Sequence, residues 1–147
     1  MQDHSRIEQA QGRLTVATRG AGFTDITREV VSWLGSIGAQ EGLLVLFVRH
    51  TSASITIQEN ADPDVLRDLA EALDKLAPRH GRYRHVTEGP DDMPSHIKSM
   101  LTAVSLSVPV AGGKAVLGRW QAIYLIEHRD APRTREIVLH YTGTRGR

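Results

Sequence analysis

The sequence predicts a single domain that contains both strands and helices, and three observations lead to this prediction. The chain has 147 residues, which is the length of one ordinary domain. Hydrophobic residues make up 40% and charged residues 24%, as in globular proteins. Segments with the alternating or continuous apolar pattern of strands are interspersed with three segments of helical periodicity. We therefore expect residues 1–147 to form one domain around one core.

The first part of the chain predicts strands on either side of a helix. Residues 6–18 are expected to form two short strands separated at Gly12. Thr24 is a suitable N-cap for a helix in which apolar residues recur at helical spacing until a glycine ends the pattern. The continuous apolar run 43–48 predicts a strand covered on both faces, and β-branched residues predict another strand at 54–58.

The second part predicts two helices followed by a strand-rich tail. Asp62 is a good N-cap and Pro63 fits the first helical position, and four leucines follow on one face. A further helix is expected over residues 95–104. Gly112 and Gly113 predict a hairpin turn. The remaining strands are expected at residues 106–110, 115–117, 121–127 and 136–141.

Composition and charge exclude several classes of protein. The chain has no cysteine, which excludes disulfide scaffolds, thiolate metal sites and cysteine nucleophiles. Its net charge of +1 gives no overall field that would steer the chain onto nucleic acid or acidic lipid. The first twenty residues lack the apolar core of a secretory signal, and the longest apolar run is too short to cross a bilayer. We expect a soluble cytoplasmic protein with neither a nucleic-acid nor a membrane partner.

A long connection separates the two later helices. Residues 78–94 contain almost no apolar side chains, and a basic, histidine-containing half precedes an acidic half. Connections of this length in a compact domain are usually functional or mobile. The segment is therefore either a ligand-binding loop or lid, or a solvated surface loop.

Three histidines stand where strands, helices or this loop could present them to a ligand. His50 follows the apolar strand, His85 lies in the long loop, and His96 is expected in the first turn of a helix. The positive end of a helix disfavours the imidazolium form, and neutral imidazole is the form that binds metal. Their spacing matches no compact metal motif, so each could instead be a structural histidine. A three-histidine metal site is one interpretation.

The segment 49–52 places two hydroxyls, those of Thr51 and Ser52, beside His50. Sequence neighbours in a strand point to opposite faces, which disfavours a nucleophile–base pair. Capping of the backbone or anion binding through hydroxyl and amide donors is favoured instead.

Several further polar residues have both a structural and a functional interpretation. Asp62 and residues 59–61 could hold a metal–phosphate group between a strand and a helix, or Asp62 could simply cap that helix. Glu127 ends an apolar strand, and Arg135 is its natural ion-pair partner unless both belong to a site. Trp120 is either a packed indole or a stacking platform for a ring.

Three stretches together resemble the YjbQ-like family, also called the secondary thiamine-phosphate synthase family. They are HTSASITIQENADPDVLRDL from His50, HVTEGPDDMPSHI from His85 and LGRWQAIYLIEH from Leu117. The resemblance covers nearly the whole chain. It implies a compact α+β domain of mainly antiparallel strands with two to three helices, assembled as a homotrimer. The chain departs from the family at Asp92, where the family usually has asparagine.

The resemblance also implies a site. Its implied metal ligands are His50, His85 and His96, for a divalent ion such as Zn²⁺ or Mg²⁺. Its implied catalytic residues are His50, Ser52, Glu127 and Arg135. Its implied substrate-binding residues are Thr51, Asn60, Asp62, Trp120 and Gln121.

The function implied is that of a metal-assisted enzyme acting on a small phosphorylated or heterocyclic metabolite. A weak thiamine-phosphate synthase activity, a transferase reaction that joins a pyrimidine methyl diphosphate to a thiazole phosphate and releases pyrophosphate, belongs to this interpretation. Two alternatives use the same residues. One is a non-catalytic sensor that binds a small ligand in the histidine-rich pocket, and the other is a scaffold whose trimer interface is its function.

Overall fold

Eight strands form two antiparallel sheets in the computed structural model, which describes residues 6–146. The larger sheet has the order β1-β8-β3-β5-β6 and the smaller one β2-β7-β4, and every strand pair is antiparallel. The α+β prediction is confirmed, with three helices. The elements are β1 (Glu8–Ala17), β2 (Gly22–Asp25), α1 (Thr27–Ser36), β3 (Ala39–Val48), β4 (Ala53–Glu59), α2 (Pro63–Leu76), α3 (Asp92–Leu101), β5 (Ser105–Ala111), β6 (Lys114–Ala115), β7 (Gln121–Glu127) and β8 (Thr134–Arg145).

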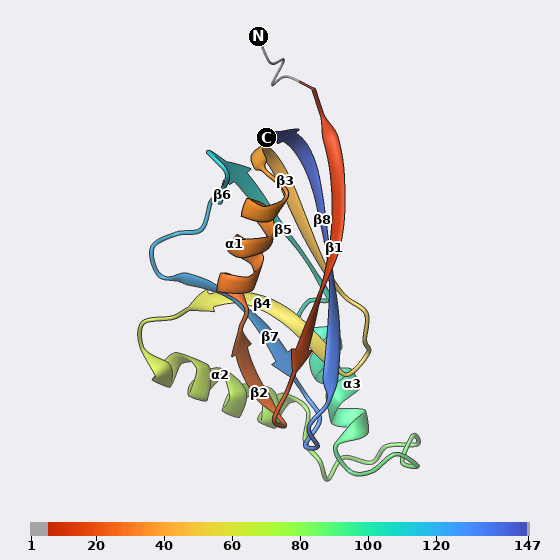
Figure 1. Cartoon of the computed structure of the whole chain (residues 1–147). Coiled ribbons are helices and arrows are strands. Elements are labelled where there is room, and N and C mark those ends of the chain that lie inside the picture. Colours follow the sequence, from red (N-terminus) through yellow and green to blue (C-terminus); the bar gives the residue numbers. More distant parts are fainter. Residues whose placement is uncertain (1–5, 147) are drawn as a thin grey trace.

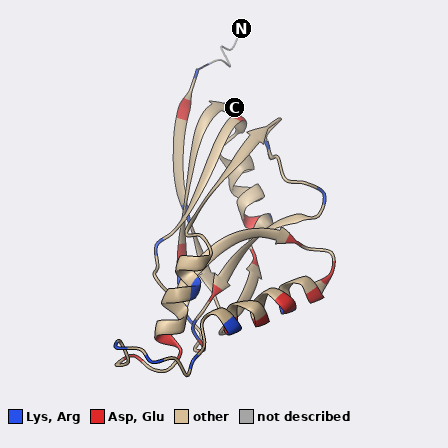
Figure 2. Ribbon diagram, turned by 180° about the vertical axis from the view of Figure 1, so that it is seen from behind, with Lys and Arg blue, Asp and Glu red and all other residues tan. Residues whose placement is uncertain are grey.

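The core lies between one face of the larger sheet and a layer made of α1 and the smaller sheet (Figure 1). Helix α2 runs along the outside of the smaller sheet, and α3 lies near the lower end of both sheets in this view. Basic and acidic residues are interspersed along the ribbon (Figure 2). None of the described helices is long and apolar enough to cross a membrane. The buried side chains of the core include Val30, Leu34, Leu44, Leu46, Ile55, Val108, Ile123, Leu125, Ile137, Leu139 and Tyr141.

The N-terminal segment forms one continuous strand, so the predicted break at Gly12 is wrong. Gly12 pairs with Leu139 in the middle of β1. A side chain is excluded there because a Cβ atom would lie 2.3 Å from Nε1 of Trp33. The glycine therefore accommodates the indole of α1 on the sheet, and does not mark a turn.

Two other predictions in the first part of the chain need correction. Thr24 is not an N-cap but pairs with Leu125 in β2, and α1 begins three residues later. Strand β3 is covered on one face only, because Leu43 is 42% and Phe47 is 46% exposed. Although the run 43–48 is apolar throughout, its side chains alternate between the core and the outer face of the sheet.

The later elements agree better with the sequence. Helix α2 begins as expected, with Asp62 accepting a hydrogen bond from the amide of Asp64 and proline at the first position. The paired glycines form the β5–β6 turn with positive φ angles of 58° and 77°. Helix α3 begins at Asp92, three residues before the expected start, because proline is tolerated in the first turn of a helix. His96 therefore lies in the second turn.

Candidate metal centre

The loop 77–91 and helix α3 bring two histidines and one carboxylate together. Nε2 of His85 lies 2.7 Å and Nε2 of His96 lies 3.3 Å from the same oxygen, Oδ2 of Asp92. The ligand atoms of the three residues lie within 4.8 Å of one another, and the two imidazole rings have centroids 5.7 Å apart. Two nitrogens and one oxygen at this spacing form a donor set suitable for a divalent metal ion.

A hydrogen bond to the backbone fixes the proton of His96. Nδ1 of His96 lies 3.1 Å from the carbonyl oxygen of Thr51. Since a carbonyl oxygen only accepts, Nδ1 donates, and the neutral ring keeps its lone pair on Nε2. This is the usual arrangement of metal-binding histidines, which donate their other nitrogen to a carbonyl or carboxylate. The lone pair faces Asp92 Oδ2, also an acceptor, so this contact requires a cation or a proton beside it.

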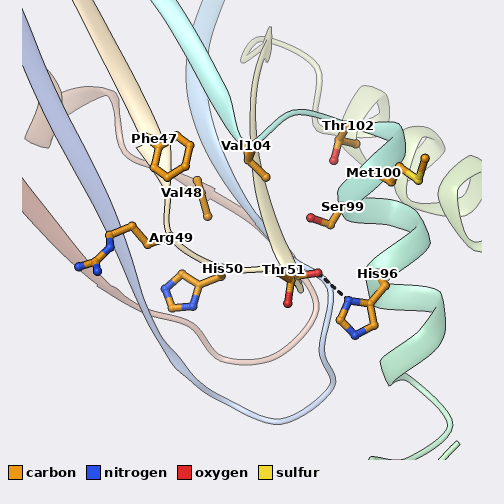
Figure 3. A pocket seen from close by; sticks show the side chains of 10 residues that line it. All are labelled: Phe47, Val48, Arg49, His50, Thr51, His96, Ser99, Met100, Thr102 and Val104. Atoms are coloured by element: carbon orange, nitrogen blue, oxygen red, sulfur yellow. Dashed lines mark hydrogen bonds between the residues drawn. The ribbon is translucent and has the colours of Figure 1, made fainter. Parts of the chain in front are cut away.

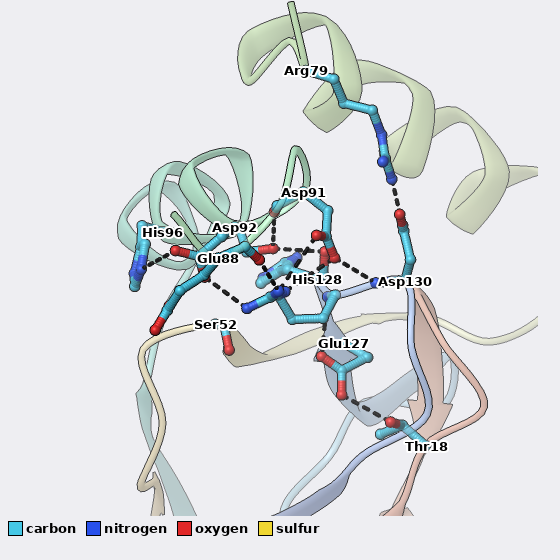
Figure 4. Close-up of polar contacts among 12 residues, drawn as sticks. Thr18, Ser52, Arg79, Glu88, Asp91, Asp92, His96, Glu127, His128 and Asp130 are labelled. Carbon is cyan, nitrogen blue, oxygen red and sulfur yellow. Dashed lines mark hydrogen bonds and ion pairs between the residues drawn. The ribbon is translucent and has the colours of Figure 1, made fainter. Parts of the chain in front are cut away.

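Arg129, in the β7–β8 loop, orients the carboxylate of Asp92. Nη1 of Arg129 donates to Oδ1 at 2.7 Å, which leaves Oδ2 toward the two imidazoles. Asp92 is only 2% exposed. Burial opposes its ionisation, but the hydrogen bond that His85 donates, the charge of His96 when that ring is protonated and the charge of Arg129 outweigh burial and lower the pKa of Asp92. Asp92 is therefore ionised and held in one orientation, as a metal ligand would need to be (Figure 4). A bound metal ion would take the place of the protons on the two Nε2 atoms.

The same arginine ties the long loop to the domain. Its Nε and Nη2 donate to Asp91, and Nη2 also donates to the carbonyl oxygen of Glu88. A second link joins Arg79, at the start of the loop, to Asp130 (Figure 4). The loop that carries His85 is thus held at both ends by the β7–β8 loop.

Glu127 and Arg135 form the ion pair expected from the sequence. Arg135 donates to both carboxylate oxygens, at 2.8 and 2.5 Å, and both side chains are buried. Thr18 and the amide of Arg129 complete the hydrogen bonds of the carboxylate. Burial alone would raise the pKa of Glu127, but these bonds, that of Arg135 first, outweigh it and lower the pKa. Both oxygens of Glu127 are thus occupied.

The loop between β3 and β4, residues 49–52, joins these groups. Nη2 of Arg135 donates to both the hydroxyl and the carbonyl oxygen of Ser52. His50 lies outside the metal-ligand cluster, and its Nε2 accepts a hydrogen bond of 2.9 Å from the amide of Glu136. Burial, together with the charge of Arg135, lowers the pKa of His50.

A cavity of about 670 Å³ adjoins the cluster. His96 forms part of both, while Arg49, His50 and Thr51 line another side of the cavity (Figure 3). The remaining wall is largely apolar, and its residues are Phe47, Val48, Ser99, Met100, Thr102 and Val104. Such a space can hold a small molecule next to the candidate metal.

Within one chain, four of the residues expected to bind substrate lie far from this cluster in space. Gln121 pairs with Glu59 at one end of the smaller sheet, whereas Ala53 pairs with Glu127 at the other, roughly 20 Å along the strand. The four residues at or beside the first end are Asn60, Asp62, Trp120 and Gln121. One chain therefore does not bring them together with the histidines.

Trp120 is not a packed indole. It is 54% exposed, and the guanidinium of Arg119 lies 4.9 Å from its ring centroid. Its carbonyl oxygen accepts a hydrogen bond from the amide of Asn60, which fixes the backbone while the ring faces outward.

The candidate ligands expected from the sequence do not include Asp92, and Arg129 is not expected as the residue that orients it. Asp92 and His96 are four positions apart, the spacing that places two side chains on one helical face. This spacing gave no usable signal, because the helix expected from the sequence begins at residue 95 and so leaves Asp92 outside it. No local pattern indicates Arg129, which reaches Asp92 from an element 37 residues away.

Comparison with known proteins places the chain among a set of similar sequences and structures. Residues 12–144 match the model of the family described as UPF0047 protein YjbQ-like. The UPF0047 protein sll1880 of Synechocystis is 48% identical over 138 residues, which are 93% of this chain and 94% of the relative. A conserved hypothetical protein of Thermus thermophilus has a TM-score of 0.77 and 42% identity, over 87% of this chain and 97% of that one. A YbjQ-like protein of unknown function from Sulfolobus solfataricus has a TM-score of 0.85 and 24% identity, over 94% and 99%, and supports the fold alone.

Proposed function

The chain belongs to the YjbQ-like UPF0047 family, and from the geometry of its cluster of His85, Asp92 and His96 we propose that it is a metal-dependent enzyme acting on a small phosphorylated or heterocyclic metabolite. One observation carries the proposal. The lone pair of His96 Nε2 faces an ionised carboxylate oxygen at 3.3 Å, with its other nitrogen held by a backbone carbonyl. A divalent cation beside these two acceptors would satisfy both.

The donor set favours a transition metal of the zinc class over magnesium. Imidazole nitrogens suit Zn²⁺ and its neighbours, whereas Mg²⁺ prefers oxygen ligands and keeps several waters. His85 and His96 are partly exposed, so a fourth position would remain open to water or a substrate oxygen. A bound ion of this class would polarise a phosphoryl or carbonyl oxygen, or lower the pKa of a bound water.

The test is the metal content of the purified, tag-free protein. We expect near-stoichiometric metal in the parent after reconstitution with Zn²⁺, and none in the double variant His85→Ala/His96→Ala. The matched control His80→Ala/His140→Ala removes two histidines outside the cluster and is expected to bind like the parent. Absence of metal in the parent, or equal metal in both double variants, would contradict the proposal.

The finer proposal concerns the reaction, and it is supported by the family resemblance. In a thiamine-phosphate synthase reaction, the bond between the pyrimidine methylene carbon and the diphosphate oxygen breaks, and its electron pair leaves with pyrophosphate. The thiazole nitrogen then supplies the electron pair of the new carbon–nitrogen bond. We expect slow, Zn²⁺-dependent release of pyrophosphate from the two precursors. Stabilisation of the fold by a precursor without any turnover would favour the sensor alternative.

We also propose the homotrimer that the family resemblance implies. Support comes from exposed apolar side chains beside the cavity, those of Phe47, Met100 and Leu101, since exposed apolar patches commonly mark interaction surfaces. Light scattering should give three times the mass of the 16.2 kDa chain. The variant Phe47→Glu should shift this mass downward, whereas a parent of one chain's mass would contradict the proposal.

A further inference from the structure

The hydrogen bond from the backbone amide of Glu136 fixes the tautomer of the His50 ring. Its Nε2 lies 2.9 Å from the amide nitrogen of Glu136, which can only donate. Nε2 must therefore be the unprotonated nitrogen, and the neutral ring carries its proton on Nδ1. While this bond is in place, Nε2 has no lone pair left for a metal ion.

The proton on Nδ1 and the backbone of the same loop form a group of free donors. Among residues 6–146, no acceptor pairs with Nδ1 of His50 or with the amides of residues 50–52. Thr51 is exposed, and its carbonyl, rather than its hydroxyl, holds His96. The loop thus presents N–H donors without a partner among the described residues, at the edge of the cavity that Arg49, His50 and Thr51 line (Figure 3).

The neighbouring carboxylates do not compete for these donors. Glu127 is already saturated by Arg135, Thr18 and an amide. Glu136 accepts from the guanidinium groups of Arg13 and Arg49. An acceptor for the loop would therefore have to come from a bound molecule, and an oxyanion suits several N–H and O–H donors at once.

We infer that His50 is a hydrogen-bond donor to an oxyanion of the substrate, bound at the 49–52 loop, and not a metal ligand. This assignment rests on the proposed function, in that the oxyanion lies beside the metal cluster of His85, Asp92 and His96. The ligand class is an organic phosphate or carboxylate with an apolar body. That body would lie against the apolar wall of the cavity, formed by Phe47, Met100 and Val104.

The first experiment measures the tautomer directly by long-range ¹H–¹⁵N NMR of the ring nitrogens. We expect His50 in the Nδ1–H form in metal-free protein. Zn²⁺ should shift the nitrogens of His85 and His96 and leave the tautomer of His50 unchanged. An Nε2–H form, or a coordination shift at His50, would overturn the assignment whether or not the protein proves to be an enzyme.

The second experiment separates donor from acceptor by substitution. In His50→Met, the thioether sulfur can still accept weakly from the amide of Glu136, but no N–H donor remains in the side chain. We expect at least about tenfold weaker binding of phenylphosphonate, as for a lost hydrogen bond to a charged group, with Zn²⁺ affinity within twofold of the parent. The comparison variant His96→Gln should lose Zn²⁺ binding, and His140→Gln should change neither affinity.

The possible outcomes distinguish the two proposals. If His50→Met weakens Zn²⁺ binding as much as His96→Gln does, His50 is a ligand and the inference fails. If the parent binds no Zn²⁺, the proposed function fails, while the phenylphosphonate titration still tests the loop. Benzoate, used in parallel, distinguishes a carboxylate site from a phosphate site, and binding of neither probe to the parent would overturn the inference.

Discussion

His128 should make the protein sensitive to mild acid. It follows β7, is only 4% exposed, and its Nε2 lies 2.8 Å from the hydroxyl of Ser54, which is fully buried. Thr102 in turn donates to the same hydroxyl at 2.6 Å. Burial, with a smaller contribution from the charge of Lys98, lowers the pKa of His128 from 6.5 to about 4.

The sign of the effect follows from which state binds the proton. Below pH 6.5 the unfolded chain protonates this histidine, while the folded protein keeps it neutral until about pH 4. The contribution of His128 to the free energy of unfolding is therefore fully present above pH 6.5. It is lost progressively as the pH falls from 6.5 toward 4, because the unfolded chain binds the proton first. A difference of this size between the two pKa values corresponds to about 3 kcal/mol.

Urea unfolding at several pH values between 7 and 4 measures this loss. We expect the free energy of unfolding of the parent to fall by about 3 kcal/mol more over this range than that of His128→Gln. The control His140→Gln removes a surface histidine that contacts Gln9 and Gln11, and it should follow the parent. Glutamine can keep a hydrogen bond to Ser54, which favours folding of the variant.

Parallel pH profiles for the parent and His128→Gln would refute this reasoning. If the variant does not fold, NMR titration of the ring of His128 in the parent decides the question. A pKa above about 5.5 would show that burial is incomplete or relieved by water, because an apolar, dry environment cannot support the charged ring at that pH.

Three further predictions concern other parts of the structure. Arg135→Met leaves the buried carboxylate of Glu127 unpaired and should lower the free energy of unfolding, measured in urea, by about 3–5 kcal/mol. The control Arg67→Met removes an exposed ion pair and should lower it by less than about 0.5 kcal/mol, so equal losses would contradict this prediction. Gly12→Val should cost about 1–3 kcal/mol and shift the fluorescence of Trp33, and an unchanged emission spectrum would show that the indole does not cover this position. Arg129→Met should weaken Zn²⁺ binding about 10–100-fold in a chelator competition, and unchanged affinity would show that the cluster needs no such support.

The fold was predictable where local chemistry decides it. Helix α2 carries its own start signal in Asp62 and Pro63, and both act as expected. The break predicted at Gly12 was wrong because the reason for that glycine lies in Trp33, 21 residues later and in another element. The exposure of Phe47 could not be predicted either. A continuous apolar run in a strand gives the same sequence pattern whether its second face is covered by the rest of the chain or exposed.

The site was predictable in its residue types and not in its grouping. His85 and His96 come together, and so do Glu127 and Arg135, but His50 has its own partner in the backbone of Glu136. Whether three histidines converge depends on the path of a 15-residue loop and the first turn of α3. Those are fixed by long-range ion pairs that leave no periodic signal in the sequence.

The loop 49–52 shows why neighbours in sequence need not share a role. His50 accepts from a strand amide, the carbonyl of Thr51 accepts from His96, and Ser52 accepts from Arg135. Three consecutive residues thus contact two different elements, β8 through Glu136 and Arg135 and α3 through His96, because successive groups along an extended chain point in different directions. Since the contact to His96 uses a backbone carbonyl, the side chain of Thr51 is not needed to orient that ring. The proposed metal cluster depends on the position of this loop, whereas the hydroxyl of Thr51 and Nδ1 of His50 would serve the proposed ligand.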